Sequence, residues 1–125
     1  AKTFRLGRIL LAGDAAHLNN SIGGMGLNGG IHDAINVADK IIKIWQGEAD
    51  ENSLDIYDIQ RRTTTHEFTQ AQTIANKKRL EAKDAETRKK NLAALKEMAL
   101  DPKRAKEFMM GTSMLSAVRR AATLG

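Results

Sequence analysis

The sequence has 125 residues, a formal net charge of +5 and no cysteine. A chain of this length forms at most one small domain, and without cysteine it has neither disulfides nor thiolate metal ligands. No run approaches the roughly 18 apolar residues that span a bilayer, and no charged and then apolar leader is present. We therefore expect a cytoplasmic protein with no membrane span. Because Ala1 is not preceded by an initiator methionine and an apolar run follows almost at once, we expect a piece of a longer chain.

The positive charge belongs to the second half of the chain. Residues 1–60 hold five Lys and Arg against eight Asp and Glu, whereas residues 61–125 hold fifteen against seven. The basic clusters are interleaved with acidic residues, a pattern typical of solvated helix faces, and an anionic partner is the alternative. The five aromatic residues are spread thinly, which is poor material for stacking bases, so we do not expect a nucleic-acid partner.

The N-terminal part of the chain predicts one short β-strand followed by a loop. Arg8–Ala12 is an apolar run that ends at Gly13-Asp14, as expected of a buried strand with a turn at its C-terminal end. A single strand cannot satisfy its own backbone, so it needs partners that this sequence does not obviously contain. The Gly- and Asn-rich segment from Asp14 to Gly30 predicts a loop.

From about Leu27 the apolar residues have the spacing of a helix. Apolar residues then recur at steps of three and four, which predicts a helix with one apolar face, anchored by Trp45 and ended by Gly47. The chain up to this point, residues 1–47, forms the first predicted part.

Residues 48–125 predict a second, wholly helical region. Ser53 is the expected N-cap of a long helix, with breaks or kinks expected at Thr63–Thr65 and at Lys83–Thr87. Asp101-Pro102 predicts a new helix start, and a last short helix is expected over Met114–Ala122. The predicted fold class is therefore mainly α with one short β-strand.

The chemistry is concentrated between the strand and the first helix. The strand delivers Asp14 to its C-terminal edge, where open α/β sheets place their ligands. The glycines of the loop let backbone approach a ligand, and the helix start presents free N–H groups that favour an anion or a polarised carbonyl. The carboxylate is suited to accepting hydrogen bonds from a polyol. The candidate ligand-binding residues are Asp14, Gly23, Gly24, Gly26, Leu27 and Asn28.

Three motifs at this spacing resemble a known family. They are Gly13-Asp14-Ala15-Ala16-His17, then Gly23-Gly24-Met25-Gly26-Leu27-Asn28, then Asp33-Ala34. Together they resemble the para-hydroxybenzoate hydroxylase family of FAD-dependent aromatic monooxygenases, over about Arg5 to Lys40. The downstream Tyr57-x-x-x-Arg61-Arg62 is similar to the family's helix after the flavin site. Ser21 departs from the pattern, since the family commonly has proline there, and a nucleotide loop of another class is the alternative.

The resemblance implies the C-terminal part of an α/β FAD-binding domain followed by a helical tail. It implies that Asp14 binds the ribityl hydroxyls of FAD, that the N–H groups of Leu27 and Asn28 face the flavin N1/C2 edge, and that Gly23–Gly26 shape the loop beside the isoalloxazine. The implied activity is monooxygenation of a small aromatic substrate through a flavin C4a-hydroperoxide, with NADH or NADPH as reductant.

Part of the family's machinery is not found. The Gly-x-Gly-x-x-Gly fingerprint that holds the ADP half of FAD does not precede residue 7, and Gly24-x-Gly26 stands in another context. We therefore expect the parent protein to be an enzyme and this chain alone to be inactive and self-associating. The alternatives are a non-catalytic helical interaction module and a basic nucleic-acid binder, both derived from such a protein.

The remaining polar residues are expected to have structural roles. His17 is expected to be a hydrogen-bonded structural residue, and Asp33, near the helix start, to interact with the helix dipole and make local hydrogen bonds. His32 and His66 have no partner at ligand spacing, so no metal site is expected. No catalytic residue is assigned within the chain.

Overall fold

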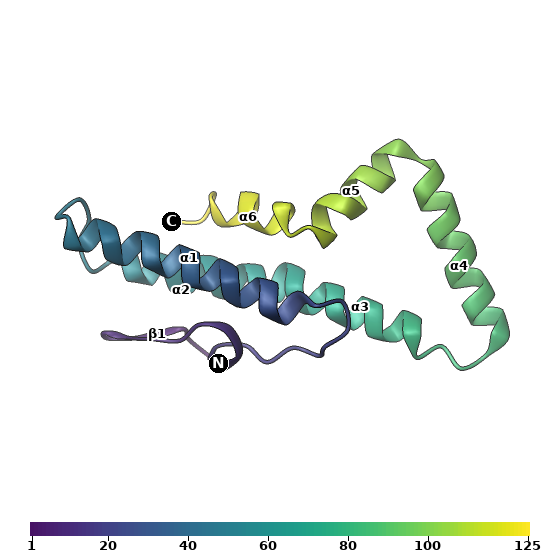
Figure 1. Cartoon of the computed structure of the whole chain (residues 1–125), viewed down its shortest axis with the longest axis horizontal. Coiled ribbons are helices and arrows are strands. Elements are labelled where there is room, and N and C mark those ends of the chain that lie inside the picture. The colour runs from purple at the N-terminus through teal and green to yellow at the C-terminus, as the bar shows by residue number, and fades with distance from the viewer.

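The computed structural model describes all 125 residues and is mainly helical. Helices α1 and α2 pack against each other in opposite directions, with a small hairpin on one side and α6 returning on the other (Figure 1). The elements are β1 (Arg5–Leu6), β2 (Ile9–Leu10), the 3₁₀ turn η1 (Gly13–Ala15), α1 (Met25–Trp45), α2 (Ser53–Thr64), the π-helical segment η2 (Thr65–Gln70), α3 (Ala71–Leu80), α4 (Ala85–Leu100), α5 (Pro102–Thr112) and α6 (Leu115–Ala121).

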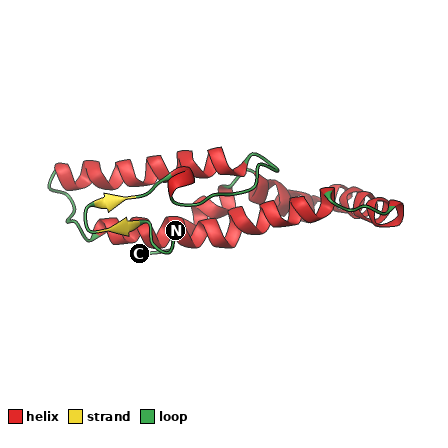
Figure 2. Cartoon of the chain, turned by 90° about the horizontal axis from the view of Figure 1, so that it is seen from below, coloured by secondary structure: helices red, strands yellow, loops and turns green.

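The prediction of one strand without a partner in this chain is wrong. The apolar run forms only β2, which pairs with β1 in an antiparallel hairpin, Arg5 opposite Leu10 and Leu6 opposite Ile9 (Figure 2). Gly7-Arg8 makes the tight turn between them, with Gly7 at φ +59°, so the partner strand is the segment just before the run. Leu6 and Ile9 remain exposed, which the predicted buried strand did not anticipate.

The helical region follows the prediction closely, except that Ser53 is the first residue of α2 and Asn52, not Ser53, holds the N-cap position. The long helix from Ser53 is interrupted by η2, which begins at Thr65, and it ends before Asp84, which caps α4 by accepting a hydrogen bond from the Thr87 N–H. Asp101 caps α5 in the same way. Helices α4 and α5 contain no buried residue and turn away from the other helices before α6 returns (Figure 1).

The core lies where the N-terminal segment meets α2. Phe4, Ala16 and Tyr57 form the fully buried cluster, with Leu11 packed against it. Asp58 on α2 accepts a hydrogen bond from the Phe4 N–H at 2.6 Å. The N-terminal hairpin is therefore held directly on α2.

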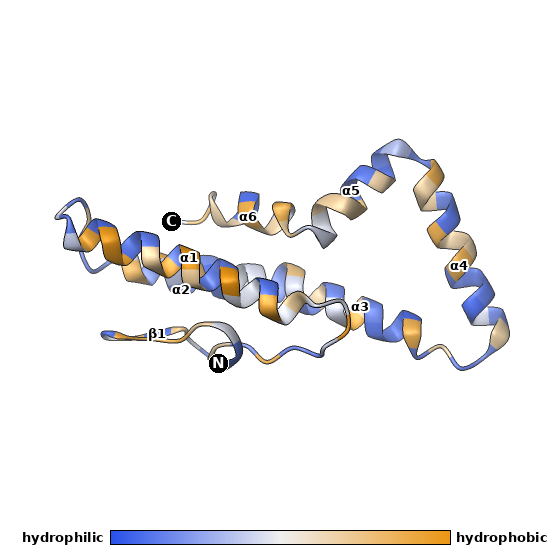
Figure 3. Cartoon of the chain, viewed as in Figure 1, coloured by the Kyte–Doolittle hydropathy of each residue, from blue (hydrophilic) through white to orange (hydrophobic).

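The apolar face of α1 is not covered by any element of this chain. Leu27, Ile31, Ile35 and Ile42 are exposed along it, and the prediction that Trp45 anchors the helix is wrong, because Trp45 is 90% exposed. Hydrophobic positions recur along the ribbon of α1, between hydrophilic ones (Figure 3). No helix is both long enough and apolar enough to cross a membrane.

Candidate functional site

An open groove lies between the turn after the hairpin and the first half of α1. Its volume is about 520 Å³. One side is built from Ala12, Gly13 and Asp14, and the other from Gly26, Leu27, Gly30, Ile31 and Ala34 of α1. The structure thus brings together Asp14, Gly26 and Leu27 of the predicted ligand-binding residues. Gly23, Gly24 and Asn28 do not line it, and Gly23 lies against the Asn76 side chain of α3.

Asp14 offers an unused acceptor to this groove. Its side chain is exposed, and the hydrogen bonds and ion pairs of the structure include none to its carboxylate. A carboxylate that has no protein partner can accept hydrogen bonds from the hydroxyls of a ligand. The groove therefore carries one free anionic acceptor at its edge.

The start of α1 offers donors on the other side. The helix begins at Met25, no side chain caps it, and Gly24 holds the preceding position at φ 64°, where a side chain would be strained. The first turn leaves the N–H groups of Met25, Gly26 and Leu27 without intrahelical acceptors. Asn28 is the first residue whose N–H has one, and its side-chain Nδ2 donates to the Gly24 carbonyl at 3.0 Å. Of the two predicted donors, Leu27 is therefore the better placed.

Two glycines let the turn lie directly on the helix. A Cβ atom on Gly30 would stand 3.2 Å from Gly13 Cα, and one on Gly13 would stand 3.7 Å from Gly30 Cα. Gly13 also has φ +60°. The backbone contact brings Asp14 close to α1, and sequence reasoning did not assign this role to either glycine.

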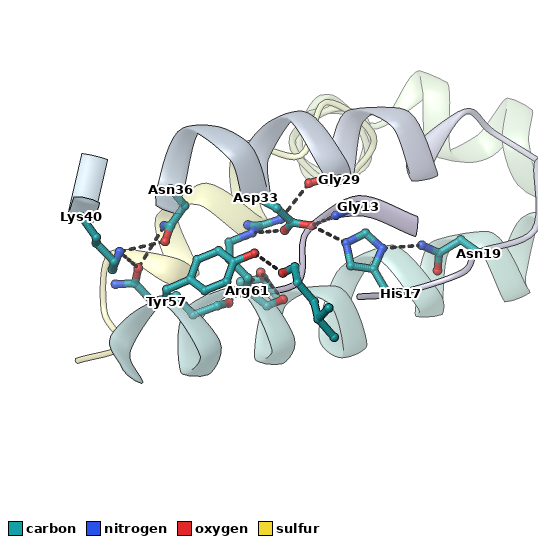
Figure 4. A network of polar contacts seen from close by, with 12 residues as sticks. Gly13, His17, Asn19, Gly29, Asp33, Asn36, Lys40, Tyr57 and Arg61 are labelled. Atoms are coloured by element: carbon teal, nitrogen blue, oxygen red, sulfur yellow. Dashed lines mark hydrogen bonds and ion pairs between the residues drawn. The ribbon is translucent and has the colours of Figure 1, made fainter. Parts of the chain in front are cut away.

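Behind the groove lies a buried polar network centred on Asp33. Asp33 Oδ1 accepts from Arg61 Nε at 2.6 Å, and Oδ2 accepts from the Gly13 N–H at 2.9 Å and from His17 Nε2 at 2.6 Å (Figure 4). Asn19 Nδ2 lies 3.1 Å from His17 Nδ1, so both ring nitrogens of His17 have a polar partner. The prediction that His17 is hydrogen-bonded is confirmed.

The predicted role of Asp33 is wrong. Because α1 starts at Met25, Asp33 lies more than two turns inside the helix, too far from its end for the dipole, and its partners are distant in sequence. Burial raises the pKa of this carboxyl, but the hydrogen bonds from His17, Arg61 and Gly13 outweigh burial, and the pKa of Asp33 is lowered. Asp33 is therefore ionised and pairs with Arg61, which is itself buried.

Tyr57 ties α2 to the end of the hairpin. Its hydroxyl donates to the Leu11 carbonyl at 2.6 Å, and burial, followed by the nearby charge of Asp33, raises the pKa of Tyr57 above its ordinary value. Tyr57 and Arg61 are one helical turn apart, so both point from α2 toward the segment that carries Asp14. Their four-residue spacing was the one sequence signal for this contact.

No group of three or more His, Cys, Asp or Glu side chains is arranged to hold a metal ion. The groove instead combines a free carboxylate, helix N–H groups and an apolar wall of Leu27 and Ile31. These suit a ligand that has hydroxyl groups next to a flat, electron-accepting ring, and so the residues present fit the flavin end of FAD.

Known proteins are similar to this chain along half of its length or more. A family model described as an FAD binding domain matches residues 1–72. The chain is 37% identical over 119 residues to para-nitrophenol 4-monooxygenase of Pseudomonas sp. (strain WBC-3), which covers 95% of this chain and 30% of that protein. It is 43% identical over 77 residues to a 3-(3-hydroxy-phenyl)propionate/3-hydroxycinnamic acid hydroxylase of Mycolicibacterium vanbaalenii, covering 62% of this chain and 14% of that protein.

A solved structure is similar along most of the chain. The crystal structure of p-nitrophenol 4-monooxygenase from Pseudomonas putida DLL-E4 matches with a TM-score of 0.79 and 35% identity, over 88% of this chain and 28% of that one. The chain thus spans about a third or less of the length of the relatives it matches.

Proposed function

The chain belongs to the FAD binding domain family, and from this we propose that it forms the flavin end of the FAD site in a monooxygenase that hydroxylates a small aromatic substrate. The family membership confirms the resemblance to FAD-dependent aromatic hydroxylases. One observation carries the proposal: the free carboxylate of Asp14 and the uncapped start of α1 face the same groove. The comparisons do not favour a non-catalytic interaction or nucleic-acid-binding module.

Each side of the groove has a distinct task in this proposal. The Asp14 carboxylate accepts hydrogen bonds from the ribityl hydroxyls and so holds the chain that joins the two ends of the cofactor. The N–H groups at the start of α1, Leu27 foremost, face the N1/C2 edge of the ring, where the positive end of the helix dipole stabilises negative charge. Gly23 and Gly24 shape the backbone beside the ring, and Leu27 and Ile31 shield one side of it from water.

Bound FAD supplies electron transfer and oxygen activation, which no side chain of this protein can supply. NADH or NADPH is the proposed reductant, and a phenol the proposed substrate class, because two of the similar proteins are named for para-nitrophenol. The ADP half of FAD and the aromatic substrate are proposed to bind outside the groove described here. The division of the chain into an FAD-binding part, residues 1–47, and a helical region, residues 48–125, remains a prediction.

The test is made on the protein that carries this sequence, with whatever segments its gene encodes around it. We expect the FAD-loaded protein to consume NADH or NADPH and dioxygen when a phenol is added, and to place one atom of labelled dioxygen in the product. Bound FAD with no phenol-dependent consumption of reductant across a panel of phenols would contradict the proposed activity. An Asp14→Ala variant that keeps its FAD would contradict the proposed site.

A further inference from the structure

The Asp33 carboxylate is the point at which three segments of the flavin site meet. It lies on α1 and accepts hydrogen bonds from the η1 backbone at Gly13, from His17 in the following loop, and from Arg61 on α2. Asp33 is fully buried and touches no solvent, so it cannot itself contact a ligand in the groove. Asp33 can therefore affect the groove only through the three residues that donate hydrogen bonds to it (Figure 4).

The geometry places those donors next to the residues of the groove. Gly13 directly precedes Asp14, and its N–H is held by Asp33 at 2.9 Å. Asp33 lies on the same rigid helix as Leu27, so this one hydrogen bond relates the free carboxylate of Asp14 to the N–H groups at the helix start. His17 adds a second tie, since its ring packs against Gly29, where a Cβ atom would stand 3.2 Å from His17 Cε1.

Hydrogen bonds from His17 and Arg61 both favour the charged form of the Asp33 carboxylate. The guanidinium donates to Asp33 Oδ1 at 2.6 Å and to the Gly29 carbonyl at 3.4 Å. The opposite charges of Arg61 and Asp33 offset each other inside the network. A charged carboxylate makes shorter and stronger hydrogen bonds than a neutral amide, which holds Gly13 more firmly.

We propose that Asp33, held by hydrogen bonds from Arg61 and His17, is a positioning residue that sets the separation between Asp14 and the start of α1, and thereby the fit of the flavin. This inference rests on the proposed function of the groove. It goes beyond that function because it assigns the fit of the cofactor to a buried ion pair that the cofactor does not touch.

The chain contains a matched control for this ion pair. Asp58 on α2 accepts the Phe4 N–H at 2.6 Å and is paired with Arg62, whose Nη2 lies 3.2 Å from Asp58 Oδ2. This pair also joins a carboxylate, an arginine and a backbone N–H of the N-terminal segment. It holds the start of β1, however, and not the turn that carries Asp14. A merely structural role would be shared by both pairs, whereas a positioning role belongs to Asp33 alone.

The experiment compares two double variants of the FAD-containing protein that carries this sequence. Asp33→Asn with Arg61→Gln removes both charges together, so that no unpaired charge stays buried. Asp58→Asn with Arg62→Gln makes the same chemical change at the control pair. We expect the first variant to raise the Kd for FAD about tenfold, since displacing Asp14 loses roughly one charged hydrogen bond, and to change the resolved shape of the bound flavin's visible absorption. We expect the second to lower thermal stability with FAD affinity and flavin spectrum unchanged.

Two further variants keep the test decisive if the first double variant does not fold. His17→Gln retains an N–H donor close to the position of Nε2, whereas His17→Leu removes it. We expect His17→Leu to weaken FAD binding and His17→Gln to restore it. Equal FAD affinity in these two variants, or equal weakening by the two double variants in proportion to their lost stability, would overturn the inference.

An Asp14→Ala variant measured alongside separates the inference from its premise. If Asp14→Ala leaves FAD affinity unchanged, the proposed function of the groove is wrong and the inference falls with it. If Asp14→Ala weakens FAD binding but the Asp33 and Asp58 pairs behave alike, only the positioning role is wrong.

Discussion

Replacing Gly30 by alanine tests how closely η1 packs on α1. The added Cβ would stand 3.2 Å from Gly13 Cα, whereas carbon atoms in ordinary contact are about 3.5 to 4.0 Å apart. The turn must therefore move away from the helix by about 0.3 to 0.8 Å. Alanine favours a helix interior over glycine by about 1 kcal/mol, while overpacking a close contact costs about 1 to 3 kcal/mol. We expect the free energy of unfolding to change little or to fall by up to about 2 kcal/mol.

Gly111 provides the matched control. It lies in α5, and a Cβ atom added there would meet nothing within 4 Å. Gly111→Ala should therefore report only the preference of a helix for alanine over glycine. We expect it to raise the free energy of unfolding by about 0.5 to 1 kcal/mol. The difference between the two variants isolates the cost of the contact between Gly30 and Gly13.

The assay is urea denaturation of both variants followed by far-ultraviolet circular dichroism. We expect Gly30→Ala to be about 1 to 3 kcal/mol less stable than Gly111→Ala, with similar dependence on urea concentration. Gly30→Ala should also bind FAD more weakly, since the movement carries Asp14 outward. Equal stabilisation by both substitutions would refute the close packing of η1 on α1.

Three further predictions concern the binding of FAD, the stability of the protein in acid and the self-association of the chain. Asp14→Ala should lower the flavin content of the protein after dialysis, because a hydrogen bond to a carboxylate contributes about 1.5 to 3 kcal/mol, and unchanged flavin content would count against its role. The pKa values of Asp33 and Asp58 are lowered, so the stability they contribute is present above the unfolded pKa of about 3.9 and is lost as pH falls further. Denaturation that shows the same stability at pH 5 and pH 3 would contradict this. The 125-residue chain alone should self-associate through the exposed apolar face of α1, and sedimentation as a stable monomer at micromolar concentration would argue against it.

The parts of the fold that could be predicted from the sequence depend on local signals. The apolar period of α1, the cap at Asp101 and the breaks near Thr65 and Asp84 each follow from residues close in sequence. The Gly-Asp motif likewise indicated where the groove lies, because the strand, the turn and the helix start that surround it follow one another in the sequence. These signals need no knowledge of which segments meet in space.

The rest depended on contacts between distant segments. Nothing in the local sequence pairs Arg61 with Asp33, which lie 28 residues apart, so the carboxylate was assigned to its own helix. The strands of the hairpin have two residues each, too short for an alternating pattern to be recognised. Trp45 was expected to be buried because it continues the apolar face of α1, but no element of this chain covers that face.

We propose that the flavin lies in the groove between Asp14 and the start of α1. A crystal structure of the FAD-bound protein that carries this sequence would show whether it does. We predict that a ribityl hydroxyl lies within hydrogen-bond distance of the Asp14 carboxylate and that the N1/C2 edge of the ring faces the Leu27 N–H. A flavin bound elsewhere, with Asp14 still free of any partner, would contradict this placement of the flavin.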